Sequence, residues 1–472
     1  MGMTGGFWSP TLPIASGGGT PSPSIVQHVA SSANPVGVGI SLNNFAFYLP
    51  NAVGAGNCLV LGITYPNGST PSVADNNGNT WPGSPTVTAD AGAGNYIAAI
   101  FVLPNANAGV TKITVSFGGN VIPFQYTISE VTSVATSAVV NGSKGAANVG
   151  TTSHATGAFT PTNNNANGGN LIWNYACIAG SSSGNPSTWS AGGSFTLLDG
   201  DIAWTSTQGV PHASQWFVQT AAASINPTLT STGDTQGYNC VAVALKAANA
   251  GTAQPAGIHI DKIIHQTNQS VPASLTLQEP TTGNLRVIEC SLSVITGITS
   301  SDGGTWVQVT DTGGAAIWYS VNRPANPNLK ITISLTGGVT QSFRFFDISG
   351  AAASPVDVTA NAAGVPNIGL LTTLNDQPDI TPTTNNGLVI AGMELGQGPG
   401  LGFNTGAPAG AIFDLVNSSS QTDLDLMDNA DCLGHLYNSG TSAETWNWHI
   451  TSFAAAGDNS SGGAVAIAFK KA

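Results

Sequence analysis

Residues 56–60 read Gly-Asn-Cys-Leu-Val, and residues 283–287 repeat them as Gly-Asn-Leu-Arg-Val. Five further stretches recur in the same order, and each second copy lies 218 to 227 positions after the first. The pairs are DNNGNTW at 75–81 with DGGTW at 302–306, YIAAIFVLP at 96–104 with AIWYSVNRP at 316–324, KITVS at 112–116 with KITIS at 330–334, TPT at 160–162 with TPT at 381–383, and VAVALK at 241–246 with VAIAFK at 465–470. Six collinear matches indicate that one domain is present twice.

This internal repeat sets the predicted domain organisation. The first copy spans residues 23–248 and the second spans residues 259–472, with a short linker at 249–258 between them. An N-terminal arm at residues 1–22 precedes the first copy. A chain of 472 residues has room for two domains of about 200 residues each.

Each copy has the pattern of short strands separated by turns. Residues 112–117 alternate between polar and apolar side chains, as a half-buried strand does. Residues 171–178 and 388–393 are apolar runs of strand length, and no window has the caps and periodicity of a long helix. We therefore predict an all-β protein of two tandem jelly-roll-like antiparallel β-sandwiches, with about nine to eleven strands each. Sandwiches of immunoglobulin topology are the alternative.

The composition argues against several functions. Charged residues make up 7% of the chain, and only ten Lys and Arg residues accompany a net charge of −13. Phosphate binding needs clustered cations, so we expect no nucleic-acid partner. No run of eighteen apolar residues occurs, so we expect no membrane partner. The N-terminus lacks the pattern of a signal peptide, so we expect assembly in a cytoplasm, with leaderless secretion as the alternative.

The five cysteines are Cys58, Cys177, Cys240, Cys290 and Cys432. None forms a CxxC pair, and an odd count in a chain of this length does not suit a disulfide framework. We expect reduced thiols that act as small buried hydrophobic groups.

Two motifs resemble functional sites but have simpler structural explanations. GSSSG at 180–184 matches the nucleophile elbow of hydrolases around Ser182, but no helix signal follows it. DNNGN at 75–79 is rich in oxygen ligands, but its glycine comes fourth, where a calcium loop has glycine sixth. We predict an Asn-Gly hairpin turn there.

The densest acidic patch contains Asp423, Asp425, Asp428 and Asp431. We predict a solvated strand edge, and a cation site is the alternative. The histidines are scattered without metal-ligand spacing. We therefore expect no catalytic residue, no cofactor and no bound metal.

The tryptophans have a predicted structural role. Trp81 and Trp306 end the same turn in both copies, which favours a core plug, with stacking on a glycan as the alternative. Trp446 and Trp448 lie two positions apart, so they would share one face of a strand, and we expect that face to be buried.

At the level of single modules, GNCLVLGITY at 56–65, DNNGNTW at 75–81 and KITVSF at 112–117 resemble repeated β-sandwich modules of tailed-bacteriophage virion proteins and of some bacterial surface proteins. The resemblance covers both copies and rests on folding motifs. It implies a non-enzymatic virion protein, such as a capsid decoration protein, head fibre or tail component. Its expected partners are other virion proteins and copies of itself, with a host-surface glycan as a further candidate. A secreted surface-layer, filament or adhesin subunit is the alternative, and a carbohydrate-binding or depolymerising protein is a second one.

The N-terminal arm at 1–22 is rich in Pro and Gly, which disfavours a helix or a central strand. Its main apolar side chains are Phe7, Trp8, Leu12 and Ile14. We expect these anchors to bury against another subunit, so that contact area offsets the lost chain entropy. The arm is therefore predicted to be an assembly element.

Overall fold

The computed structural model of the chain contains β-strands and no helix in its described part. The described residues are 22–32, 42–92, 95–121, 124–150, 152–162, 169–180, 187–200, 211–233, 236–248, 257–268, 274–290, 295–309, 316–335, 341–362, 380–395, 402–406, 412–413, 416–417, 430–438, 440–443, 447–452 and 462–472. The strands pair in packed sheets that are almost entirely antiparallel, so the predicted all-β sandwich class is confirmed.

The first eight strands form one β-sandwich, which we call the first module. Its larger sheet has the order β1-β8-β3-β6-β5, and its smaller sheet has the order β2-β7-β4. The chain crosses repeatedly between the two sheets, as in an eight-stranded jelly roll. The strands are β1 (Ser24–Ser32), β2 (Leu42–Tyr48), β3 (Cys58–Pro66), β4 (Pro71–Asp75), β5 (Val87–Asp90), β6 (Tyr96–Leu103), β7 (Lys112–Val121) and β8 (Gln125–Thr132).

The second module repeats this order of strands. Its sheets are β9-β16-β11-β14-β13 and β10-β15-β12. The strands are β9 (Val140–Val149), β10 (Ser153–Ala155), β11 (Asn170–Ile178), β12 (Thr188–Ala191), β13 (Thr196–Gly200), β14 (His212–Gln219), β15 (Thr228–Thr232) and β16 (Tyr238–Lys246).

The third module has the order β17-β24-β19-β22-β21 with β18-β23-β20. Its strands are β17 (His259–Asn268), β18 (Ser274–Gln278), β19 (Leu285–Cys290), β20 (Ile295–Ser300), β21 (Val307–Val309), β22 (Ala316–Val321), β23 (Lys330–Leu335) and β24 (Gln341–Ser349). The fourth module has β25-β32-β26-β30-β28 with β27-β31, while β29 pairs with β2 of the first module. Its strands are β25 (Ala351–Ala362), β26 (Leu388–Leu395), β27 (Gly402–Gly406), β28 (Ile412–Phe413), β29 (Val416–Asn417), β30 (Ala430–Tyr437), β31 (Asn447–Ser452) and β32 (Gly462–Lys471).

The number of strands differs from the sequence prediction. Nine to eleven strands were expected in residues 23–248, and the described part of that range contains sixteen. The reason is that two sandwiches, rather than one, occupy it. The quoted stretches nevertheless fall at corresponding places, because β7 begins at Lys112, β23 begins at Lys330, and both lie at the centre of a smaller sheet.

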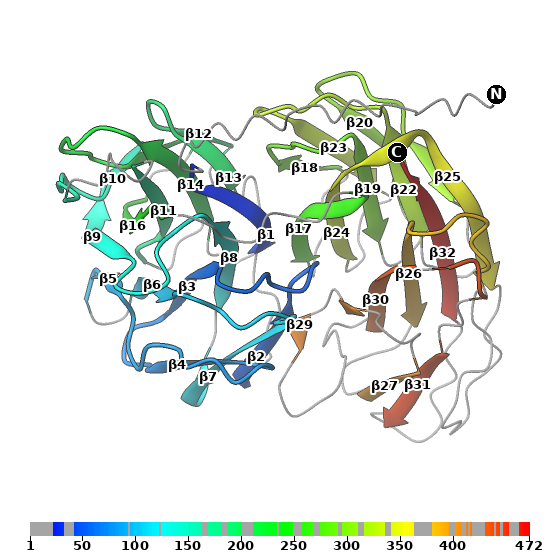
Figure 1. Ribbon diagram of the computed structural model, residues 1–472, viewed down its shortest axis with the longest axis horizontal. Coiled ribbons are helices and arrows are strands. Elements are labelled where there is room, and N and C mark those ends of the chain that lie inside the picture. Colours follow the sequence, from blue (N-terminus) through cyan, green and yellow to red (C-terminus); the bar gives the residue numbers. More distant parts are fainter. Residues whose placement is uncertain are drawn as a thin grey trace, which may run out of the picture.

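One parallel pairing joins the two halves of the chain. Strand β1 pairs with β17 from His28 opposite Lys262 to Ser32 opposite Gln266. The larger sheets of the first and third modules thereby become one ten-stranded sheet with β1 and β17 at its centre. Figure 1 shows the two halves side by side, each as a stack of sheets.

The two halves face in opposite directions. Val29 and Ile263 lie on one face of the ten-stranded sheet, where the smaller sheet of the first module packs. Ala30 and Ile264 lie on the other face, where the smaller sheet of the third module packs. Parallel central strands with exchanged faces define a pseudo-two-fold axis that runs along the strands, within the sheet.

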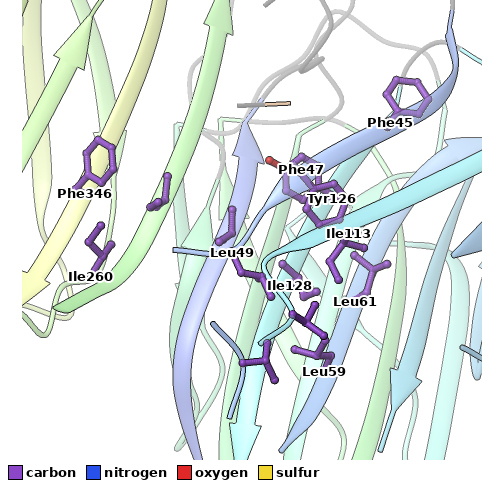
Figure 2. Packing of buried hydrophobic residues seen from close by; sticks show 14 of the residues in the cluster. Phe45, Phe47, Leu49, Leu59, Leu61, Ile113, Tyr126, Ile128, Ile260 and Phe346 are labelled. Carbon is purple, nitrogen blue, oxygen red and sulfur yellow. The ribbon is translucent and has the colours of Figure 1, made fainter. Parts of the chain in front are cut away.

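The second and fourth modules cover the faces that remain. Val60 of β3 shares a core with Trp173 of β11, so the larger sheets of the first and second modules pack face to face. Val287 of β19 and Ile390 of β26 belong to one core in the other half. Figure 2 shows how this core extends across the halves, with Ile260 and Phe346 in the same cluster as the first module's aromatic residues.

Candidate functional site

Three modules meet around a cavity of about 300 Å³ on one side of the central strand pair. The first module contributes β1, the second contributes β13 and β14, and the third contributes β17, β24 and the segment after β18. Apolar walls come from Ile25, Leu197, Trp216 and Pro280. The volume is at the lower end of the range for small-molecule sites.

A buried carboxylate, Asp199 of β13, lies at the inner end of this junction. Its Oδ2 is 2.8 Å from His28 Nε2 and 3.0 Å from the Thr127 hydroxyl, and it also accepts a hydrogen bond from Ser214. His212 Nε2 lies 3.5 Å from the other carboxylate oxygen. Burial alone would raise the pKa of Asp199, but the hydrogen bond from His28 and the other donors outweigh burial and hold it below its usual range.

A chain of hydrogen bonds fixes the proton on His28. Trp173 Nε1 donates to Ser129 Oγ at 3.0 Å, and Ser129 Oγ lies 2.9 Å from His28 Nδ1. An ionised carboxylate can only accept, so His28 donates its Nε2 proton to Asp199. In the neutral imidazole Nδ1 is then the acceptor, and the Ser129 hydroxyl donates to it while accepting from the Trp173 indole. Burial lowers the pKa of His28 more than Asp199 raises it. The pair is therefore a neutral imidazole hydrogen-bonded to a carboxylate.

Lys262 of β17 is also buried, and its ammonium is used within the protein. Nζ donates to the Pro280 carbonyl at 2.6 Å and to the Leu198 carbonyl, and it lies 3.7 Å from Glu279 Oε2. These contacts join the second module to the third. A lysine with this many protein acceptors positions the modules and has little capacity left for an anion.

Two further carboxyl groups line the cavity, Asp347 of β24 and Asp261 of β17. Asp347 accepts backbone hydrogen bonds from Thr282 at 2.6 Å and from Gly283 at 3.1 Å. The Thr282 hydroxyl lies 3.2 Å from Asp261 Oδ2 and 3.3 Å from Asp347 Oδ2. Burial and the nearby Asp261 charge raise the pKa of Asp347 to about 6.

The pseudo-two-fold axis supplies a second junction with which this one can be compared. In the first half, Gln27 of β1 lies opposite Glu130 of β8, just after a bulge in β1. In the second half, Lys262 of β17 lies opposite Asp347 of β24, just after a bulge in β17. Gln27 therefore corresponds to Lys262, and Glu130 corresponds to Asp347. Asn51 corresponds to Thr281. Asn51 follows Leu49-Pro50 after β2, and Thr281 follows Glu279-Pro280 after the equivalent strand β18.

The second junction is filled by a side chain. The Tyr437 hydroxyl donates to Asn51 Oδ1 at 2.6 Å and accepts the Ile260 N–H at 3.0 Å. Tyr437 pairs with Leu388 at the start of β26, and Val218 pairs with Leu171 at the matching place in β11. A valine therefore stands on the cavity side where a tyrosine stands on the filled side.

Most of the sequence-predicted site residues lie outside the described part of the chain. This applies to the arm anchors Phe7, Trp8, Leu12 and Ile14, to Ser182 of the GSSSG motif, to Asp423, Asp425 and Asp428, and to Trp446. Asp431 lies in β30 opposite Glu394, and Trp448 lies in β31 opposite Thr405. Their predicted roles stay predictions.

The turn at 75–81 is structural, but it is not a hairpin. Asp75 Oδ1 accepts the Asn77 N–H at 2.8 Å, and Asp75 Oδ2 accepts the Trp81 indole N–H at 2.8 Å. Trp81 is 7% exposed and belongs to the core, as predicted. The hairpin prediction is wrong because β4 and β5 pair with different strands in different sheets. The Asn-Gly pair turns the chain from one layer to the other.

The corresponding turn in the third module has other partners. Asp302 lies 2.5 Å from the fully buried Arg286 guanidinium and 3.1 Å from Arg323. Trp306 is partly buried against the third module's core. Both turns therefore anchor on an aspartate, one through an indole and one through two guanidinium groups.

The cysteine prediction is confirmed where side chains are described. Cys58, Cys177, Cys240 and Cys290 are buried and free. Burial raises the pKa of Cys58 and of Cys177, the latter to about 12, so neither thiol is poised as a nucleophile.

Sequence reasoning missed the junction residues His28, Asp199, Asp261, Lys262 and Asp347. A usable signal was present, because a chain with 7% charged residues places His-Ile-Asp-Lys at 259–262 at the head of an apolar strand. Charges inside a strand of such a chain are costly unless they are paired or functional.

Comparisons with known proteins give no family. No family model matches, and no curated protein matches. Among solved structures, a xanthan lyase of Paenibacillus aligns with a TM-score of 0.17 at 10% identity, over 91% of this chain and 53% of that one. A likeness at this level carries no argument about fold or function.

Two searches of the described residues were also negative. They contain no helix long and apolar enough to cross a membrane. Within the same ranges, no group of three or more His, Cys, Asp or Glu side chains is arranged to hold a metal ion.

Proposed function

We propose that the chain is a non-enzymatic structural protein of a bacteriophage virion, which decorates or projects from the capsid or forms part of the tail. The observation that carries the proposal is the β1–β17 pairing, which makes two halves into one block with a continuous ten-stranded sheet. A block of this kind suits a load-bearing or spacing element. The module-level sequence resemblance supplies the virion context.

The polar groups of the junction support a structural role. His28, Asp199 and Lys262 make their hydrogen bonds across module boundaries. A hydrolytic site needs a nucleophile or base that is free to reach a substrate. These groups instead hold modules together, which is the use that an assembly protein makes of buried polar contacts.

The test concerns the predicted assembly arm. A chain lacking residues 1–22 should fold with an unchanged circular dichroism spectrum but should not join its particle. A second variant keeps the arm and replaces Phe7, Trp8, Leu12 and Ile14 by serine, which removes only the apolar anchors. Occupancy measured by cryo-electron microscopy of reconstituted particles should fall in both variants. Unchanged occupancy in both would contradict the assembly role of the arm.

A separate test concerns the absence of catalysis. A fluorophosphonate probe of serine hydrolases should leave Ser182 unlabelled in the intact protein. Labelling that disappears in Ser182→Ala would contradict a purely structural function.

A further inference from the structure

We propose that the three-module cavity is a binding site for an organic cation, an ammonium group carried on a short apolar chain. The inference is independent of the proposed assembly role. It rests on three features of the junction, which are its open volume, its excess of carboxylates and its departure from the pseudo-two-fold symmetry.

The two junctions differ in the side chain that stands between the modules. At the counterpart, Tyr437 contacts both Asn51 and the β17 backbone. On the cavity side the matching residue is Val218, and about 300 Å³ is left between the modules. That space equals the liquid volume of about ten water molecules, so the cavity has room for a small organic ligand.

The excess of carboxylates gives the sign of the ligand's charge. Asp199, Asp261, Glu279 and Asp347 lie in or beside the cavity, and Lys262 is the ammonium among them. The second cation close to Asp347 along the sheet, Arg286, directs its guanidinium to Asp302 at 2.5 Å. His259, which is 20% exposed, lies 3.1 Å from Asp261 Oδ1. Burial lowers the pKa of His259, but the hydrogen bond and charge of Asp261 outweigh burial and raise it. Lys262 and His259 thus offset two of the four carboxylates, and the remaining excess favours a bound cation.

The departure from symmetry concerns the charges of β1 and β17 beside the two junctions. The filled junction has neutral Val26 and Gln27 at the positions of Asp261 and Lys262, as the two bulges show. Among the described residues there, the carboxylate of Glu130 accepts from Gln27, from Asn57 and from the Gly54 N–H. The cavity side carries the carboxylate of Asp261 at the position where the other side has the apolar Val26.

The walls decide between kinds of cation. The described residues offer no three-ligand group for a metal ion. The walls include Ile25, Leu197, Trp216 and Pro280, which suit an alkyl chain or the face of a cation. An ammonium would donate hydrogen bonds to Asp261 and Asp347, whose oxygens converge on Thr282. The site thus fits the end of a lysine side chain as well as a free alkylamine.

The experiment uses the full-length chain and n-butylammonium as probe. Isothermal titration calorimetry at pH 7 should give saturable binding with one site, while the neutral analogue 1-butanol should bind at least about tenfold more weakly, because charge-assisted hydrogen bonds are lost. A blocked peptide, acetyl-Gly-Lys-Gly-amide, distinguishes the two sources of an alkylammonium group. Binding of the peptide indicates the lysine side chain of a partner protein. Binding of butylammonium without binding of the peptide indicates a free amine.

Three variants locate the site. Asp261→Asn and Asp347→Asn should each weaken butylammonium binding about tenfold or more. Ala325→Trp, at an exposed position on the cavity rim, should block entry without touching the buried charges. The control is Asp357→Asn, which changes a partly exposed carboxylate of the fourth module away from the cavity, and it should bind as the natural chain does. Each variant is first checked for an unchanged circular dichroism spectrum and for cooperative unfolding above the titration temperature.

Two results would overturn the inference. One is the absence of saturable butylammonium binding to the natural chain. The other is butylammonium binding of unchanged affinity in Asp261→Asn, Asp347→Asn and Ala325→Trp, which would place the ligand elsewhere. Equal affinity for 1-butanol would likewise contradict the inference, because it would remove the role of charge.

Discussion

His28 of the first module and Asp199 of the second are joined by a hydrogen bond of 2.8 Å, and both side chains are buried. The bond connects β1, at the centre of the ten-stranded sheet, with β13, at the edge of the second module's larger sheet. The contact between modules therefore depends on a polar cluster as well as on apolar packing.

Removing the Asp199 carboxylate should be strongly destabilising. Asp199→Ala leaves the donors of His28, Thr127 and Ser214 buried without an acceptor, which should cost about 3 kcal/mol of unfolding free energy. The measurement is the urea midpoint followed by tryptophan fluorescence. Asp90→Ala, an exposed carboxylate on β5, is the control and should cost less than about 1 kcal/mol. Equal shifts in the two variants would show that the cluster does not stabilise the fold.

Asp347 should make the stability depend on pH. Its folded pKa of about 6 lies above its ordinary value of 3.8, so the folded chain holds a proton that the unfolded chain releases. Stability from this group is full below pH 4 and falls as the pH rises towards 6. Relative to the natural chain, Asp347→Asn should therefore gain about 3 kcal/mol between pH 4 and pH 7.

The control for this pH effect has the opposite sign. Hydrogen bonds from Thr383 and Thr384 outweigh burial and lower the pKa of Asp357, so Asp357→Asn should lose stability relative to the natural chain as the pH rises. The Asp357 effect develops below about pH 4 and the Asp347 effect above it, so urea unfolding at intervals from about pH 2 to pH 7 measures both. A stability difference for Asp347→Asn that does not change with pH would contradict the assignment.

The two halves should stay together after the chain is cut. A protease site placed in residues 249–256 should yield fragments that elute together, because the β1–β17 ladder, the shared core and the Asn51–Tyr437 hydrogen bond hold them. Size-exclusion chromatography after cleavage measures this. Adding Ile263→Asp, which buries a charge in the shared core, should separate them. Fragments that separate without that substitution would show the ladder to be weak.

The two aspartate-anchored turns should differ in their sensitivity. Asp302→Ala strands the fully buried Arg286 guanidinium, which should cost about 3 to 5 kcal/mol. Asp75→Ala removes one acceptor from the Trp81 indole and from the turn, which should cost about 1 to 3 kcal/mol. The two melting temperatures give the comparison. A larger loss for Asp75→Ala would contradict the charge-based explanation.

The strand content could be predicted because single strands carry their own pattern. Residues 330–335 alternate between half-buried and buried positions, as their polar and apolar side chains require. The layering could also have been inferred. Strands β3 and β11 are apolar along nearly their whole length because packed sheets cover both of their faces. A two-sheet sandwich has one solvent face per sheet, so such runs already indicated stacked sandwiches.

The junction could not be predicted from the sequence. It forms because β1 and β17, more than 200 positions apart, pair in parallel, and no local pattern specifies that register. The two junctions differ further at Tyr437 and Val218, whose equivalence becomes visible only when the strands are aligned in space. The charges of residues 259–262 were visible in the sequence, but their neighbours were not.

The pseudo-two-fold axis has a consequence for how the chain has diversified. Three modules share one strand order, and the described strands of the fourth match it in their larger sheet, which points to two successive internal duplications, the second of a pair of modules. A duplicated pair inherits the same junction twice, and each copy then accumulates substitutions separately. In the present chain Tyr437 makes the polar contact between modules at one junction, and charged residues stand at the other. Because the chain contains two copies of the junction, charged residues at the cavity are compatible with the fold as long as the Tyr437 junction holds the modules together.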